Sequence, residues 1–90
     1  MNGINKKQLA IALKYVREEM DAPKILAKGY GDIAKKIVEL ARQNNIPIES
    51  DKHLAEILST VEANNTIPIE AFAAVAGILS RIYEIDSRAT

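Results

Sequence analysis

The chain offers few side chains that could perform catalysis or hold a metal. His53 is the single histidine, and the one further ligand type at helical spacing beside it is Glu56. A His/Glu pair without other ligands makes neither a zinc nor a di-iron site. With no cysteine and no serine in a nucleophile elbow, nucleophilic catalysis has no candidate residue. The sequence therefore predicts a protein that is not an enzyme and that uses no metal and no cofactor.

Two patterns could suggest phosphate or nucleic-acid binding. Gly29-Tyr30-Gly31 lies between an expected strand and an expected helix, as a phosphate-binding loop does. It lacks the third glycine and the lysine-serine/threonine ending of a P-loop, and a turn explains both glycines. Lys35-Lys36 and the other basic residues are not interleaved with aromatic ones. We predict neither nucleotide nor nucleic-acid binding.

Length and composition favour one small globular domain. The 90 residues are 48% hydrophobic and 27% charged, which argues against disorder. No run approaches the roughly 20 apolar residues of a membrane span, and the first residues lack the apolar core of a signal peptide. We expect a soluble cytoplasmic protein without direct membrane insertion. Its single domain spans 1–90, with a core at 5–86 and flexible ends at 1–4 and 87–90.

Charge is uneven along the chain although the total is zero. Residues 1–45 hold nine Lys/Arg and five Asp/Glu, whereas residues 46–90 hold three and seven. The two halves could pack together and present a mixed surface, because isolated surface charges are weak and screened. The alternative is a bipolar surface that orients a partner. We favour the mixed surface.

Hydrophobic alternation predicts a small sheet. Residues 8–15 alternate with a period of two, and the alanines on one side would let a helix pack closely. Residues 24–28 form a second apolar run that ends at two glycines. Ile46-Pro47-Ile48-Glu49 is too short for a helix and is interpreted as a third strand at an edge. With the helix between them, the last two strands would make a right-handed βαβ unit.

Helical periodicity accounts for the rest. Asp32 is the expected cap of a helix over 33–41, which Asn44-Asn45 would end. Ser50 or Asp51 would cap a second helix ending near residue 61. Thr66 would cap a third, with Pro68 in its first turn and a frayed tail at 86–90. Its core stripe is expected to be Phe72, Val75, Ala76, Leu79, Ile82 and Tyr83. The predicted fold is α/β or α+β, with three to four strands and about three helices.

Several short stretches together resemble the cytoplasmic domain of the FlhB/YscU family, the substrate-specificity switch proteins of flagellar and virulence type III secretion. Ala22-Pro23-Lys24 and Ala27-Lys28-Gly29 carry the opening of the likeness. Ile46-Pro47, Ile67-Pro68 and Ala74-Val75-Ala76 carry it onward, and it covers about residues 5–86. The closer likeness is to stand-alone FlhB-related cytoplasmic proteins, because family members usually carry transmembrane helices ahead of this domain.

The family's self-cleavage motif, Asn-Pro-Thr-His, is degenerate here. It aligns with Asn5, Lys6, Lys7 and Gln8, so the asparagine alone remains. In the family the asparagine side chain attacks its own carbonyl within a tight turn made by the proline. Lys6 removes the locked φ, and Gln8 cannot exchange protons near neutral pH as histidine can. We expect no self-cleavage.

The resemblance also implies a partner-binding patch. In the family a small apolar surface receives a short hydrophobic motif of early export substrates, and its positions match Ala22, Pro23, Ala76 and Leu79. Pro23 is expected to be exposed at a loop end. Ala76 and Leu79 share a helix face, which could be either this patch or part of the core. Gly77 stands where relatives tend to carry a glutamate.

The resemblance implies a binding module of protein export. Its partners would be rod or hook export substrates or the cytoplasmic domain of the export gate. The alternative is a structural or regulatory interaction protein that kept the fold after the export role lapsed.

The degenerate motif yields a first prediction. The purified chain held for days at neutral pH keeps its full mass, because the turn that drives the asparagine onto its carbonyl is missing. Intact-mass spectrometry checks this result, and loss of residues 1–5 would contradict it.

Overall fold

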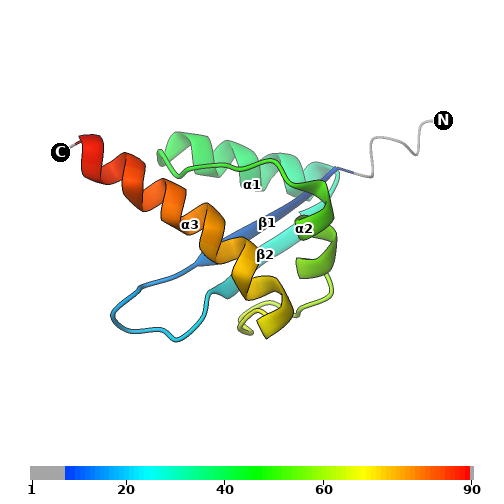
Figure 1. Cartoon of the computed structure of the whole chain (residues 1–90). Coiled ribbons are helices and arrows are strands. Elements are labelled where there is room, and N and C mark those ends of the chain that lie inside the picture. Colours follow the sequence, from blue (N-terminus) through cyan, green and yellow to red (C-terminus); the bar gives the residue numbers. More distant parts are fainter. Residues whose placement is uncertain (1–7, 90) are drawn as a thin grey trace.

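A hairpin of two strands and three helices make up the fold (Figure 1). The structure is a computed structural model that describes the backbone of residues 8–89 and the side chains of residues 8–82. In chain order the elements are β1 (Leu9–Lys14), β2 (Lys24–Tyr30), α1 (Asp32–Gln43), α2 (Lys52–Leu58) and α3 (Ile69–Ala89).

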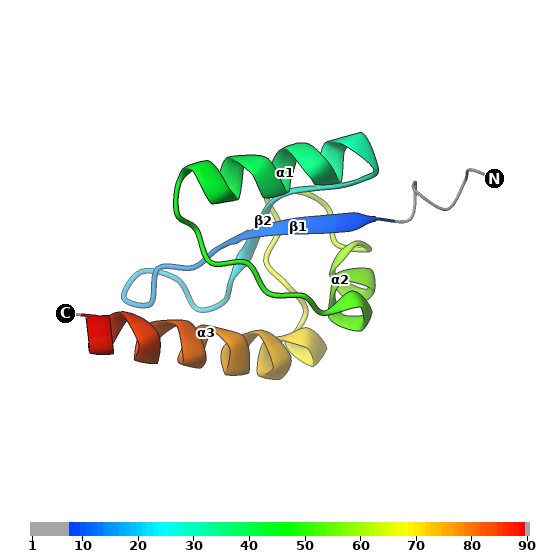
Figure 2. The ribbon, with the colours of Figure 1, turned by 90° about the horizontal axis from the view of Figure 1, so that it is seen from above.

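The hairpin is the middle of three layers. β1 and β2 are antiparallel, and a bulge shifts their register between Ala12 and Leu13. Figure 2 shows α1 on one side of the strands and α3 on the other. This arrangement is the α+β alternative of the predicted fold class, with the predicted three helices, and it is confirmed.

The two faces of the hairpin differ in side-chain size. Ile11 and Leu13 pack against the main hydrophobic core. The opposite face includes Gly29 and its partner Ala10, and α1 lies so close that a Cβ on Gly29 would be 2.2 Å from Cγ2 of Ile33. The alternation of large and small residues in β1 therefore has the predicted effect: the face with small side chains lets α1 pack closely against the strands.

The expected third strand does not form. Ile46-Pro47-Ile48-Glu49 is irregular, and in the described part of the chain the sheet has two strands and no βαβ unit. Pro47 has no N–H to donate, and the N–H of Ile46 turns back to the Ala41 carbonyl at 2.8 Å. Glu49 ties the segment to α3 through an ion pair with Arg81 at 2.8 Å.

Local signals set most helix ends. Asp51 caps α2 by accepting a hydrogen bond from the Leu54 N–H at 3.0 Å, as predicted. Asn45 takes the left-handed conformation (φ 56°) after α1. The N-cap of α1 is Gly31 at φ 60°, so the expected capping by Asp32 is wrong; Asp32 begins the helix. At the other end of α2, the ammonium of Lys28 donates to the Ser59 carbonyl at 2.8 Å.

The third helix starts later and runs further than expected. Thr66 does not cap it but forms a bridge with Lys24, because residues 64–67 pair with the start of β2. α3 therefore begins at Ile69. It reaches Ala89 instead of fraying after Asp86, and its last turns contain no glycine or proline that would end a helix.

The core is small and dry. Among the described side chains no polar or charged group is buried. The core cluster consists of Ile25, Leu54, Leu58, Ile67, Ala71 and Val75. On α3, Ala71 and Val75 are deepest, while Phe72 and Leu79 pack at its margin. Tyr83, expected in the stripe, lies outside the described side chains.

Two glycines give opposite predictions. Gly29→Ala forces Cβ into Ile33, so we expect overpacking that costs about 1–3 kcal/mol. Gly77→Ala meets nothing within 4 Å in the middle of an exposed helix turn and should stabilise the protein by about 1 kcal/mol. Thermal unfolding followed by circular dichroism measures both. Equal midpoints for the two variants would contradict the close approach of α1.

Candidate functional site

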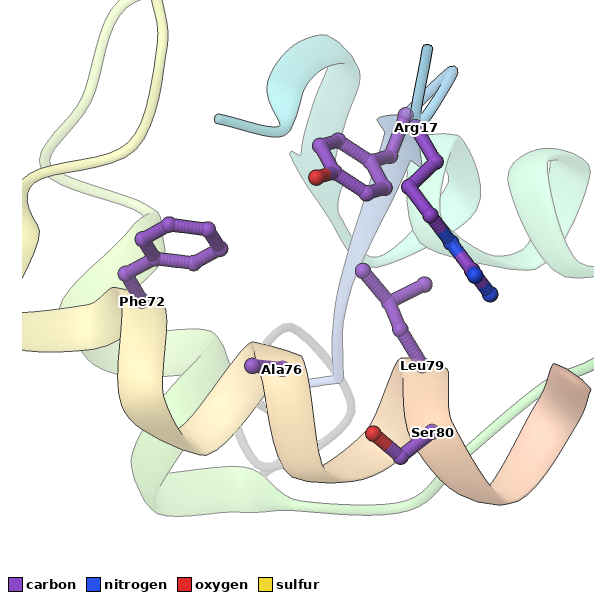
Figure 3. Close-up of a pocket in the computed structure, with 6 residues that line it drawn as sticks. Arg17, Phe72, Ala76, Leu79 and Ser80 are labelled. Carbon is purple, nitrogen blue, oxygen red and sulfur yellow. The ribbon is translucent and has the colours of Figure 1, made fainter. Parts of the chain in front are cut away.

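An apolar groove lies between α3 and the chain that follows β1 (Figure 3). Its volume is about 300 Å³. It is lined by Tyr15, Arg17, Phe72, Ala76, Leu79 and Ser80. We call it the α3 groove. Two of the four predicted partner-binding residues, Ala76 and Leu79, are therefore brought together in one hollow.

The floor of the α3 groove follows from helical spacing. Phe72, Ala76 and Leu79 recur at intervals of four and three and share one side of α3. Burial of Val75 fixes the rotation of the helix and turns this side to the margin of the core. The small side chain of Ala76 lies between the larger ones of Phe72 and Leu79 and leaves the hollow (Figure 3).

The opposite wall comes from the connection between the two strands. Tyr15 directly follows β1, and Arg17 extends beside Leu79 (Figure 3). A turn holds this connection, because the N–H of Met20 donates to the Val16 carbonyl at 2.8 Å. Arg17 is the one charged residue among those that line the groove.

Ala22 and Pro23 do not line the α3 groove. Pro23 is less than 2% exposed, so the expectation of an exposed proline is wrong. Its carbonyl accepts a hydrogen bond from the Ile67 N–H at 3.0 Å, so the chain that leads into α3 is paired with the backbone at this proline. Ala22 is half-buried.

Ala76 and Leu79 differ in how they relate to the core and to the groove. Leu79 is half-buried and packs against the core, and it also lines the groove. Ala76 is half-buried and lines the groove without belonging to the core. The groove residues that sequence reasoning did not assign to the site are Tyr15, Arg17, Ser80 and Phe72, the last of which was expected only in the core stripe.

Other candidate chemistry gains no support from the geometry. Among the described residues no three His, Cys, Asp or Glu side chains gather as metal ligands, and His53 is exposed. Of the degenerate cleavage motif, Asn5 to Lys7 lie outside the described residues. Gln8 is exposed, and its carbonyl accepts from the Gly31 N–H at 2.8 Å.

Fold and groove together define a small α+β domain with a largely apolar hollow beside α3. Comparison with known proteins identifies the family of the chain. The chain belongs to the FlhB HrpN YscU SpaS family, whose model matches residues 4–82. The resemblance drawn from the sequence is confirmed.

Individual relatives agree with this assignment. The chain is 42% identical over 85 residues to the flagellar biosynthetic protein FlhB of Borreliella burgdorferi, covering 93% of this chain and 23% of that protein. It is 34% identical over 77 residues to YlqH of Bacillus subtilis, and the match covers 86% of this chain and 83% of that protein. The crystal structure of the cytoplasmic domain of FlhB from Shewanella putrefaciens superposes on this chain with a TM-score of 0.79 at 40% sequence identity. The superposition covers 86% of this chain and 65% of that structure.

The chain thus spans less than a quarter of the FlhB protein from Borreliella burgdorferi and most of YlqH. No helix within the described residues has the length and apolar character needed to cross a membrane.

Substitution on adjacent residues of α3 separates groove from core. Ala76→Asp places a carboxylate in the open groove, so the thermal midpoint should fall by only a few degrees. Val75 is 1% exposed, so Val75→Asp buries an unpaired charge and should abolish the folding transition. Ala74→Asp, at an exposed position of the same helix, controls for the lower helix propensity of aspartate. A midpoint for Ala76→Asp far below that of Ala74→Asp would assign Ala76 to the core.

Proposed function

We propose that this chain is a soluble, cytoplasmic binding module of flagellar or type III protein export. It is a homologue of the export switch domain and performs no enzymatic reaction. Its partners are rod or hook export substrates, or the cytoplasmic domain of the export gate. The observation that carries the proposal is an apolar groove built on α3 in a chain that belongs to the FlhB HrpN YscU SpaS family.

The α3 groove suits a short apolar segment of a partner. Phe72 and Leu79 supply hydrophobic surface, and the small Ala76 between them leaves room for an incoming side chain. At about 300 Å³ the hollow holds only a few side chains. A contact confined to this hollow would bury little surface, and small interfaces are typical of weak and transient contacts, which suit a protein that must release each partner.

Arg17 adds a charged group to the wall of the groove. Its guanidinium lies at the wall beside Leu79 and is the one charge among the lining residues. Pro23 and Ala22 contribute indirectly, because the covered proline positions the chain that leads into α3.

The proposed module acts without cleaving itself. Lys6 and Gln8 replace the proline and histidine of the family's motif, and without the fixed φ of that proline we expect no self-cleavage. The degenerate motif also supports a second candidate function, that of a structural or regulatory interaction protein that kept the fold without the export role. Fusion of residues 5–90 behind the membrane helices of a switch protein lacking its own domain tests the difference, with motility and hook length as readouts.

Binding measurements test the groove directly. Rod and hook subunits and the gate's cytoplasmic domain are titrated with the wild-type chain, Ala76→Asp and Ala74→Asp. We expect at least one partner to bind, Ala76→Asp to abolish that binding, and Ala74→Asp to leave it unchanged. Equal binding by all variants, or no binding to any of these proteins, would count against the proposal.

A further inference from the structure

The outward side of α3 carries no charge over much of its length. Residues 71–80, between Glu70 and Arg81, include no charged side chain. Part of this stretch packs against the core, but Ala74 and Gly77 are exposed. The exposed side of a surface helix normally carries charged and polar residues. Figure 2 shows none of the other described elements beyond α3 on the side away from the hairpin, so this side of the helix is unpartnered.

The folded chain alone does not require the glycine on this side. A Cβ at Gly77 would meet nothing within 4 Å, and the φ of this residue is not positive. A glycine in the middle of a helix destabilises the fold by about 1 kcal/mol relative to alanine. Glycine has a use where another backbone comes close. Gly77 therefore favours the approach of a second helix to α3.

Gly77 belongs to a line of residues along α3. Residues spaced by four, three and four positions share one side of a helix, and here they are Glu70, Ala74, Gly77 and Arg81. All four are exposed. The two outer residues have opposite charges, and the two inner ones have the smallest side chains. We call this line the α3 seam.

The α3 seam is complementary to itself when two copies lie antiparallel. Positions 70 and 81 have the same midpoint as positions 74 and 77. A two-fold axis at this midpoint places Glu70 opposite Arg81 of the second copy, and it places Ala74 opposite Gly77 of the second copy. Each contact then occurs twice, as a two-fold symmetric interface requires.

The charges at both ends of the α3 seam are accessible to a second copy. Arg81 pairs with Glu49 at 2.8 Å, yet its side chain is 58% exposed. A guanidinium has five N–H donors, so one carboxylate does not saturate it. The pair with Glu49 also limits the motion of the arginine, which lowers the entropy cost of a further contact. Glu70 is exposed and forms no ion pair with another described side chain.

We propose that the outward side of α3 is the interface of a homodimer, in which two copies of the chain pair antiparallel along the α3 seam. The small side chains at the centre let the helix axes come close. The two ion pairs between Glu70 and Arg81 fix the register. The α3 groove lies on another side of the helix, that of Phe72 and Leu79, so the dimer leaves both grooves open and does not depend on the function proposed for them.

The pattern of the α3 seam favours a second copy over an unrelated helix. A partner helix needs an acidic and a basic residue eleven positions apart, with small residues between them, and α3 itself has this pattern. A single pair of helices buries less surface than a standard interface, so we expect a weak dimer. Ala74→Asp remains a valid control for the groove at concentrations at which the chain is monomeric.

Sedimentation of the full chain tests the dimer. We expect the average mass to rise from one chain toward two between micromolar and millimolar concentrations, and high salt to oppose this rise. Gly77→Gln puts a long side chain on the α3 seam and should weaken association at least tenfold, since the helices can no longer come close. The same variant should unfold at a higher temperature when dilute, because a Cβ at this position meets nothing in the single chain.

Two charge reversals test the register. Glu70→Arg and Arg81→Glu each put like charges opposite one another, so each variant alone should associate at least tenfold more weakly than the wild type. An equal mixture of the two should recover the association, because opposite charges then meet at both ends. The matched control is Glu39→Arg on α1, which changes the net charge as Glu70→Arg does and should leave association unchanged. Circular dichroism verifies that every variant is folded.

Any of three results would contradict the dimer. The first is the mass of a single chain at all concentrations up to millimolar. The second is association that persists unchanged in Gly77→Gln, which would place the interface elsewhere on the molecule. The third is a mixture of Glu70→Arg and Arg81→Glu that associates no better than either variant alone, which would exclude the antiparallel register.

Discussion

The rest of the structure depends on the pairing between the start of β2 and residues 64–67. Ile25 is fully buried, and both its backbone groups bond to Asn64 and Asn65. Its side chain lies in the cluster that holds α2 and α3. Because Ile67 bonds to the carbonyl of Pro23, the chain enters α3 at a fixed point. That entry, together with the burial of Val75, places one side of α3 opposite Tyr15 and Arg17 and so creates the groove.

Most features governed by neighbouring residues were predictable, with the cap of α1 as an exception, because Gly31 and not Asp32 precedes that helix. The alternation in β1, the cap at Asp51 and the left-handed stop at Asn45 each depend on a few adjacent residues, and all are present. Features governed by distant residues were not. Thr66 has the chemistry of a cap but bridges to Lys24 instead. Ile46 to Glu49 has the composition of a strand, but in the described chain it makes no backbone hydrogen bond to β1 or β2, and the Ile46 N–H bonds to Ala41 instead.

The residues of the candidate site show the same difference between features set by nearby residues and features set by distant ones. Helical spacing put Ala76 and Leu79 on one face, but it could not decide between core and surface, since the rotation of α3 depends on what covers it. Tyr15 shares the parity of Ile11 and Leu13, so strand alternation could have identified its side of the sheet. Arg17 lies beyond the strand, where that parity no longer applies. Pro23 was misjudged because its carbonyl pairs with Ile67, a residue far away in sequence that the pattern around the proline does not reveal.

The pairing of Ile25 with Asn64 and Asn65 also has a kinetic consequence. It closes a loop that runs from residue 25 to residue 65, whereas the hairpin and α1 are built from neighbours in the chain. Closing a long loop costs entropy before its contacts form. We therefore expect the hairpin and α1 to form early in folding and α3 to dock late, so that the groove exists only in the completed fold. A partner held in the groove would then stabilise the whole chain, because it binds the folded state alone.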